Sequence, residues 1–201
     1  MSHRNTVRIA LAPIVFVLAL GSTGLSRAEE KMAAPATVPG VKGEILVWIQ
    51  DAEDKLGQLA DAMPESKYSW RPGKDVRSVG EVFMHVAAAN YGIPSFIGVK
   101  APDGFNFETY EKSLTKKSDI QKAMKASFEH VKASFTAMSD ADMEKPQAFF
   151  GMKTTGRGAY LLIMSHCHEH LGQSIAYARS NGVVPPWTAK EQAEEAKAKK
   201  K

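Results

Sequence analysis

Three histidines lie within five residues of one another near the carboxyl-terminal end of the chain, at positions 166, 168 and 170. Successive residues of a helix are turned by about 100°, so His166 and His170 lie about 40° apart and one turn displaced, whereas His168 lies about 200° from His166. The rings of His166 and His170 can therefore converge on one point. Two neutral imidazoles at this spacing make half of a divalent metal site, because each can place a ring nitrogen about 2.0–2.1 Å from one ion.

A third ligand has to come from another helix, and His85 is the candidate because it lies in a mostly apolar stretch, 83–87. Three histidines leave one coordination position free for water or substrate, an arrangement associated with catalysis rather than with structural metal sites. Such a ligand set suits zinc, nickel, iron or copper, so the type of metal stays open. The alternative interpretation is that His85, His166 and His170 are separate core or half-exposed histidines.

The remaining candidate groups are expected to pack or to face solvent rather than to bind metal: His130, His168, Cys167 and Glu169. His130 is flanked by charged residues, which indicates the polar side of its helix. Cys167 lies about 100° from His166 and is interpreted as a small buried apolar residue. Gln173 lies three residues beyond His170 on much the same face, where it could orient a metal-bound water or cap the core.

Four stretches with apolar residues at steps of three and four must position these groups: 41–63, 79–91, 118–138 and 159–180. Ser78 and Glu81 have the spacing of a capping box before the second stretch, and Ser118 and Gln121 repeat it before the third. Gly182 is a plausible left-handed cap after the fourth. Segments 98–117 and 139–158 show no clear period and are expected to be loops. No alternating strand pattern competes, so the sequence predicts an all-α, antiparallel four-helix bundle.

The amino-terminal residues have the order of a secretory signal. Two arginines precede an apolar run from Ile9 to Leu20, and small residues follow up to Ala28. This run is too short to span a membrane, which needs about 20 helical residues. We expect a cleaved signal peptide and a protein that is periplasmic or secreted. The predicted organisation is a signal peptide at 1–28, a linker at 29–40, the bundle at 41–187 and a tail, frayed or disordered, at 188–201.

The net charge of +4 is unevenly distributed along the chain. The signal segment 1–28 contains three basic residues and no acidic one, and the tail after Trp187 contains five basic and three acidic residues. Residues 29–187 carry 18 basic against 19 acidic residues, so the predicted bundle is nearly neutral. A basic stripe that would bind phosphates is absent from the sequence, which disfavours a nucleic-acid partner. Cys167 is the only cysteine and cannot form an internal disulfide.

With these motifs in place, the sequence resembles the DinB-like superfamily of four-helix bundles, which includes the YfiT-type metalloenzymes. The resemblance covers about Val41 to Trp187 and rests on the motifs Tyr68-Ser69-Trp70-Arg71-Pro72, Ser78-Val79-Gly80-Glu81-Val82-Phe83-Met84-His85-Val86 and His166-Cys167-His168-Glu169-His170-Leu171-Gly172-Gln173, followed by Asn181-Gly182 and Pro185-Pro186. In that family one histidine of the second helix and two of the last helix, before a Gly-Gln pair, bind the metal. The resemblance implies that His85, His166 and His170 are the ligands.

Members of the family resemble thiol-dependent transferases and isomerases that act with bacillithiol, mycothiol or glutathione. Such thiols are mainly cytosolic, and the secretory signal is a departure from the typical member. The expectation is therefore an exported protein that binds zinc, nickel or iron through three histidines and acts on a small molecule as a hydrolase or a thiol transferase. The alternative is a non-catalytic binding or interaction module with the same fold. An apolar face on the first predicted helix could support a homodimer.

Overall fold

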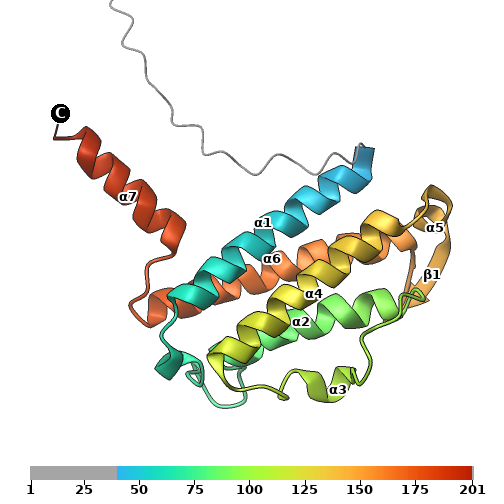
Figure 1. Ribbon diagram of the computed structural model, residues 1–201, viewed down its shortest axis with the longest axis horizontal. Coiled ribbons are helices and arrows are strands. Elements are labelled where there is room, and N and C mark those ends of the chain that lie inside the picture. The colour runs from blue at the N-terminus through green and yellow to red at the C-terminus, as the bar shows by residue number, and fades with distance from the viewer. Residues whose placement is uncertain (1–39, 201) are drawn as a thin grey trace, which may run out of the picture. The chain divides into compact units, whose positions relative to one another are not determined.

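Four long helices dominate the computed structural model, which describes residues 40–200. They are α1 (Gly40–Ala62), α2 (Val79–Ser95), α4 (Lys117–Ala137) and α6 (Gly156–Ser180). They pack as one bundle (Figure 1), which confirms the predicted all-α four-helix fold. The predicted signal peptide and all but the last residue of the predicted linker lie outside the described residues. Between residues 40 and 200, no helix combines the length and the apolar character needed to cross a membrane.

Two of the long helices run one way and two the other, but the consecutive helices α2 and α4 are parallel. Near the start of both helices Gly80 approaches Ile120, and further along both Asn90 Nδ2 donates a hydrogen bond of 3.1 Å to Ser127 Oγ. The segment 96–116 between them is long enough to return to the end of the bundle where α2 began (Figure 1). It contains the short helix α3 (Phe107–Tyr110), so the predicted loop is partly helical.

The start of α2 follows its predicted capping box. The Glu81 backbone N–H donates to Ser78 Oγ at 3.3 Å, and the Ser78 N–H donates to Glu81 Oε2 at 2.7 Å. These two bonds satisfy donors that the first turn of a helix otherwise leaves free. The helix continues beyond the predicted end near residue 91 and includes Pro94 in its last turn.

The capping box predicted at Ser118 and Gln121 is wrong. Helix α4 begins at Lys117 without a side-chain cap, and Gln121 Nε2 instead donates to Asp61 Oδ1 at 2.7 Å. Lys117 Nζ donates to the backbone oxygens of Asp61 and Met63, at 2.8 and 2.7 Å. The positive charge of Lys117 is favourable here, because the last carbonyl groups of a helix lack intrahelical partners and carry partial negative charge. Lys117 and Gln121 thus tie the start of α4 to the end of α1, and the backbone N–H groups of the first turn of α4 have no side-chain cap.

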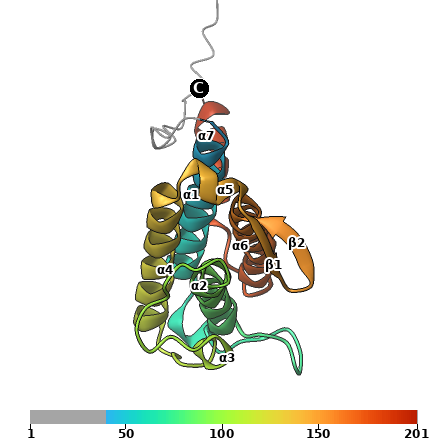
Figure 2. The same cartoon turned by 90° about the vertical axis from the view of Figure 1, so that its right-hand side faces the viewer.

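Segment 139–158 is not the predicted loop. It contains the short helix α5 (Asp140–Glu144) and an antiparallel hairpin of β1 (Pro146–Phe149) and β2 (Met152–Thr155), which lies beside α6 (Figure 2). The two residues of its turn, Phe150 and Gly151, have φ values of 50° and 73°. Positive φ at both positions is what a tight two-residue hairpin turn requires, but asparagine and glycine are its usual signal.

The carboxyl-terminal segment is helical. Gly182 has φ 75° and ends α6 in the left-handed conformation, as predicted. The tail, expected to be either frayed helix or disorder, lies largely in the helix α7 (Pro186–Ala198), none of whose residues is buried. Pro186 occupies the first helical position, where its missing N–H costs nothing.

Candidate metal centre

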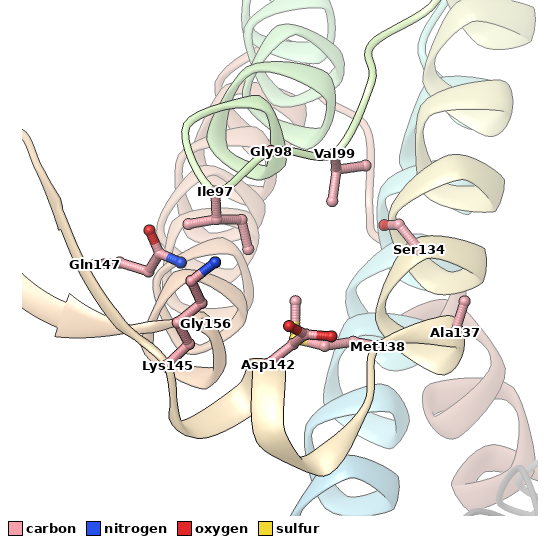
Figure 3. A pocket seen from close by; sticks show the side chains of 10 residues that line it. All are labelled: Ile97, Gly98, Val99, Ser134, Ala137, Met138, Asp142, Lys145, Gln147 and Gly156. Carbon is pink, nitrogen blue, oxygen red and sulfur yellow. The ribbon is translucent and has the colours of Figure 1, made fainter.

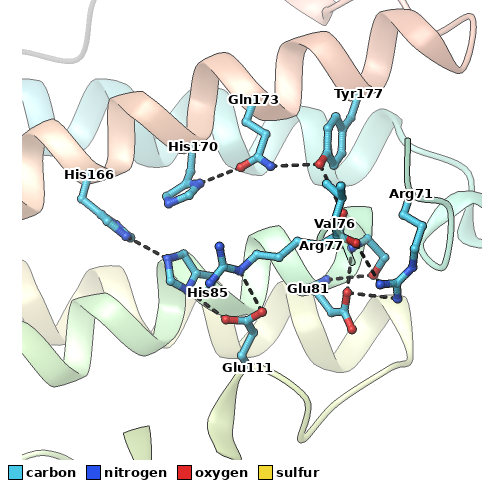
Figure 4. Close-up of polar contacts among 11 residues, drawn as sticks. Arg71, Val76, Arg77, Glu81, His85, Glu111, His166, His170, Gln173 and Tyr177 are labelled. Carbon is cyan, nitrogen blue, oxygen red and sulfur yellow. Dashed lines mark hydrogen bonds and ion pairs between the residues drawn. The ribbon is translucent and has the colours of Figure 1, made fainter. Parts of the chain in front are cut away.

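The three histidines proposed as metal ligands come together in the structure. His85 lies on α2, and His166 and His170 lie one turn apart on the facing helix α6 (Figure 4). One ring nitrogen from each lies within 4.8 Å of the other two, and the Nε2 atoms of His85 and His166 are 3.1 Å apart. His170 is buried, and the other two rings are partly buried. Packing of α2 against α6 therefore places three imidazoles around one point.

Hydrogen bonds on the outer side fix the ring of His85. Its Nδ1 lies 2.9 Å from Glu111 Oε2, and Arg77 Nε donates to the other carboxylate oxygen, Oε1, at 2.8 Å. A carboxylate can only accept, so the Nδ1 of His85 carries the proton. In the neutral ring, Nε2 then presents a lone pair toward the other two histidines.

A second chain of hydrogen bonds fixes His170. Gln173 Nε2 donates to the Tyr177 hydroxyl at 2.9 Å, and that hydroxyl donates to the backbone oxygen of Arg77 at 3.2 Å. The Gln173 amide oxygen is therefore the acceptor for Nδ1 of His170, 2.8 Å away. Consequently the Nε2 of His170 is also an unprotonated donor atom in the neutral ring. This assigns Gln173 the role of orienting a ring rather than capping the core.

Glu111 and Arg77 are functional residues that the sequence analysis missed. Glu111 follows α3 in a segment without periodicity, and it lies 26 residues from His85 in the chain. An isolated glutamate in such a segment carries no local signal. Arg77 precedes the capping serine of α2 and reaches Glu111 across 34 residues. Only the return of segment 96–116 along the bundle brings the two together.

The environment of the cluster keeps two of its rings neutral. Burial lowers the pKa of His166 to about 3, and the nearby rings of His170 and His85 and the Arg77 guanidinium act in the same direction. Burial also lowers the pKa of His85, with Arg77 and His170 adding to the effect while Glu111 opposes it. Metal binding requires unprotonated imidazoles. At neutral pH these two rings are therefore ready to accept a cation.

The lowered pKa of His166 predicts that the metal-free protein loses stability in mild acid. Between its folded pKa of about 3 and the ordinary value of 6.5, the unfolded chain binds more protons than the folded chain. The contribution of neutral His166 to the free energy of unfolding is thus fully present above pH 6.5 and decreases as the pH falls toward 3. Thermal unfolding of metal-free wild type and His166→Gln at about pH 7 and pH 5 measures it, because the variant has no proton to gain. Equal losses in both proteins would contradict the assignment.

Within residues 40–200, the two other histidines, His130 and His168, lie outside the cluster. His168 Nδ1 lies 2.8 Å from the backbone oxygen of Met164 and its ring contacts Trp48 edge-on, which confirms the expected packing or rim position. His130 was expected on the polar surface, and this is wrong. Its ring is half-buried, 5.1 Å from the ring of Tyr91, and burial lowers its pKa. The helix α4 presents His130 to the aromatic residues around α3 although its sequence neighbours are charged.

Cys167 and Glu169 lie where the helical spacing placed them. Cys167 is fully buried, its Sγ lies 3.5 Å from Asn90 Oδ1, and burial raises the pKa of its thiol to about 12. It is therefore a packed thiol at neutral pH and is not a member of the cluster. Glu169 is exposed on the outer face of α6, as expected.

A polar pocket of about 590 Å³ adjoins the histidine cluster. Its lining includes Arg77, Glu111 and Gln173, the groups that hold two of the rings from outside. Another pocket, of about 410 Å³, lies near the far ends of α2 and α4 and is lined by residues such as Ser134, Asp142 and Lys145 (Figure 3). None of the three clustered histidines lines either pocket, but the lining of the polar pocket includes Glu111 and Gln173, which contact His85 and His170 directly. The polar pocket is thus the one associated with the candidate metal centre.

Two solved structures with the same fold come from Bacillus species. A DinB-like protein from Bacillus cereus is 21% identical, with a TM-score of 0.59 over 70% of this chain and 94% of that one. YfiT from Bacillus subtilis, described as a probable metal-dependent hydrolase with an unusual four-helix bundle topology, is 15% identical, with a TM-score of 0.57 over 75% of this chain and 94% of that one. At these identities the likeness concerns the fold.

A sequence match to a curated protein is shorter. The accessory component TagJ of the type VI secretion system of Pseudomonas aeruginosa is 33% identical over 76 residues. The match covers 34% of this chain and only 27% of that protein. In contrast, the sequence profile of the DinB superfamily matches residues 49–174, which include all three clustered histidines. The chain therefore belongs to the DinB superfamily.

Proposed function

We propose that the protein binds one divalent transition metal ion through His85, His166 and His170 and uses it in hydrolysis or group transfer on a small molecule. The observation that carries the proposal is the convergence of three ring nitrogens, two of them set as donors by hydrogen bonds from the opposite side of the ring. Zinc, nickel and iron all accept such a ligand set. The description of YfiT as a probable metal-dependent hydrolase agrees with this assignment.

The donor set fits a metal ion. Two nitrogen ligands of a tetrahedral ion, each about 2.0–2.1 Å from it, lie about 3.3 Å apart. The Nε2 atoms of His85 and His166 are 3.1 Å apart, close to this value, and a ring nitrogen of His170 lies within 4.8 Å of the other two rings' nitrogens. The Nδ1 of His85 faces a carboxylate and that of His170 faces an amide oxygen, which is the usual support for metal-binding histidines. A bound ion would supply Lewis-acid activation of a water or a substrate oxygen.

The chain's own residues position groups in this site rather than transfer protons. Glu111 accepts a hydrogen bond at each carboxylate oxygen, from His85 and from Arg77, and these contacts suit it to hold the His85 ring. Gln173 cannot be protonated at neutral pH, and it orients His170. The proposed activity therefore depends on the orientation of the three rings and on the polar pocket beside them.

Metal analysis of protein purified without a histidine tag tests the proposal. Metal-free protein is reconstituted separately with zinc, nickel, iron and cobalt, dialysed, and analysed for elemental content. We expect about one ion per chain and a higher melting temperature after loading, because an ion that binds only the folded chain stabilises it. The loaded protein is then assayed against panels of hydrolase substrates and thiol acceptors. Absence of stoichiometric metal under all four conditions would overturn the proposed function.

A second candidate is a non-catalytic metal-binding module. It is favoured by the lack of an uncommitted acid or base in the centre, since Glu111 is engaged twice and Glu169 faces solvent. Stoichiometric metal together with no turnover on either substrate panel would favour this candidate. Turnover that disappears on metal removal and returns on reloading would exclude it.

Export of the protein is a separate part of the proposal and rests on residues 1–28. The basic start, apolar run and small residues before Glu29 are typical of a cleaved signal. Expression of the full chain in a bacterium, cell fractionation and amino-terminal sequencing test it. We expect a periplasmic product that begins near Glu29, and an uncleaved product in the cytosol would contradict export.

Replacement of Glu111 should weaken metal binding without removing a ligand. Glu111→Gln keeps the shape of the side chain but removes the charge that holds the Nδ1 proton of His85. Loss of such a supporting carboxylate typically lowers metal affinity about 10- to 100-fold. Competition with a chelator of known affinity measures the change. Glu108→Gln changes an exposed glutamate of α3, three residues before Glu111, and is the matched control. A similar loss in both variants would contradict the role of Glu111.

A further inference from the structure

The candidate metal centre has an uncompensated positive charge once an ion is bound. Its three imidazole ligands are neutral, so they do not reduce the charge of a divalent cation. The nearest carboxylate, Glu111, is shared between His85 and Arg77. The negative charge of Glu111 is thus balanced by the guanidinium of Arg77. A ligand that carries a negative charge would therefore be favoured in this site over a neutral one of the same shape.

Arg77 is placed to contact such a ligand. Its Nε is held by Glu111 at 2.8 Å, and Figure 4 shows the guanidinium beside the ring of His85. Among residues 40–200, neither of its two Nη atoms has a hydrogen-bond partner, and the side chain is 39% exposed. A guanidinium anchored through Nε presents its remaining N–H donors in a fixed direction, which suits a planar carboxylate.

In a second arginine of the same region, both Nη atoms already have partners within the protein. Arg71 also lines the polar pocket, but its Nη1 donates to the backbone oxygen of Val76 at 2.8 Å and its Nη2 contacts Glu81 Oε2 at 3.1 Å. Both ends of its guanidinium are thus in use within the protein. Arg71 and Arg77 therefore contribute the same charge to the pocket but differ in the donors that they can offer to a ligand.

The pocket beside Arg77 has room for the rest of a small molecule. Its volume of about 590 Å³ is bordered by Gln173 and Glu111, which contact His170 and His85, and by Lys112 on the outer side. A molecule in this pocket with a carboxylate on Arg77 would lie next to the histidine cluster. Pockets of this size hold ordinary metabolites.

We propose that Arg77 binds a carboxylate of the substrate and that the protein acts on small carboxylate-bearing molecules, held in the polar pocket beside the metal centre. This inference rests on the proposed metal-dependent function. It assigns Arg77 as a specificity-determining residue that contacts the substrate, while Glu111 and Gln173 orient the metal ligands.

Binding of two probes of equal shape and different charge tests the proposal. Untagged, cobalt-loaded protein is titrated with benzoate and with benzamide, and its visible absorption bands report binding at the metal centre. We expect wild type to bind benzoate at least about tenfold more tightly than benzamide, because a desolvated charge pair adds to the affinity. Arg77→Gln should lower the benzoate affinity about tenfold or more and leave benzamide within about threefold. Arg71→Gln, the matched control, should change both by less than about threefold.

The outcomes separate this inference from the proposed function. If wild type does not take up cobalt, both fail. If it takes up cobalt but shows no preference for benzoate, or if Arg71→Gln and Arg77→Gln lose benzoate affinity equally, only the assignment of Arg77 is overturned. Should Arg77→Gln not retain cobalt, Arg77→Lys decides the question. This variant keeps the charge without the planar fork, so we expect a loss of about three- to tenfold for benzoate alone, and no loss would contradict the proposal.

Discussion

Replacement of His85 by alanine is expected to abolish stoichiometric metal binding. His85 is the only member of the histidine cluster that lies on α2, and its Nε2 is 3.1 Å from the Nε2 of His166. Four-ligand zinc sites bind with about 10–16 kcal/mol, or about 2.5–4 kcal/mol for each ligand. Loss of one ligand therefore lowers affinity by roughly 60- to 700-fold. Elemental analysis after dialysis and chelator competition measure the effect, and we expect the variant to retain only a small fraction of an ion per chain.

His168→Ala is the matched control for this experiment. His168 lies two residues from both His166 and His170, but its ring faces Trp48 and its Nδ1 is bonded to a backbone oxygen. The variant should bind metal within about threefold of wild type, because no ring nitrogen of the cluster is lost. Equal losses of metal in His85→Ala and His168→Ala would show that the assigned ligand set is wrong. Retention of a full ion by His85→Ala would show the same.

Replacement of Phe135 by alanine is expected to cause a large loss of stability without touching the metal centre. Phe135 is fully buried on α4, and its ring stacks on that of Tyr160 from α6, with centroids 4.1 Å apart and planes 13° from parallel. Truncation of a buried phenylalanine leaves a cavity and costs about 3–5 kcal/mol. In a domain of this size that loss lowers the melting temperature by about 6–20 °C. Chemical and thermal denaturation of the metal-free protein measure it.

Phe150→Ala provides the comparison with an exposed residue of the same type. Phe150 is 57% exposed at the tip of the hairpin, so its truncation removes little buried area and should change stability by about 0.5 kcal/mol or less. The folded fraction of Phe135→Ala should still bind metal normally, since Phe135 contacts none of the three histidines. A loss of stability in Phe135→Ala no larger than that in Phe150→Ala would contradict the packing described for α4 and α6.

Features that depend on neighbours within one helix were predictable. The convergence of His166 and His170 follows from a four-residue spacing, and the same geometry correctly separated His168 from them. The capping box of Ser78 likewise involves groups three residues apart. Similar logic failed at Ser118 and Gln121, because α4 begins one residue earlier, at Lys117, and Gln121 contacts Asp61 of α1 instead.

Features that depend on the path of the chain were not predictable. The parallel arrangement of α2 and α4 depends on where segment 96–116 runs, and periodicity carries no information about that path. The hairpin turn has its usual glycine at Gly151, but Phe150 occupies the first position, where asparagine, aspartate or glycine is the usual signal. The surface position expected for His130 was wrong because charged neighbours in the chain do not reveal which helices pack around a ring.

The sequence by itself determined a helical bundle in which His166 and His170 share one face, because helix geometry repeats every few residues and needs no partner. It also pointed to His85 through an apolar setting on another helix. Only the tertiary structure decided how the rings are held and what lies beside them. Glu111, Arg77 and the polar pocket meet the histidines through contacts between segments 26 or more residues apart. Such contacts depend on how α2, α6 and the returning segment pack together, and packing is a property of the whole chain.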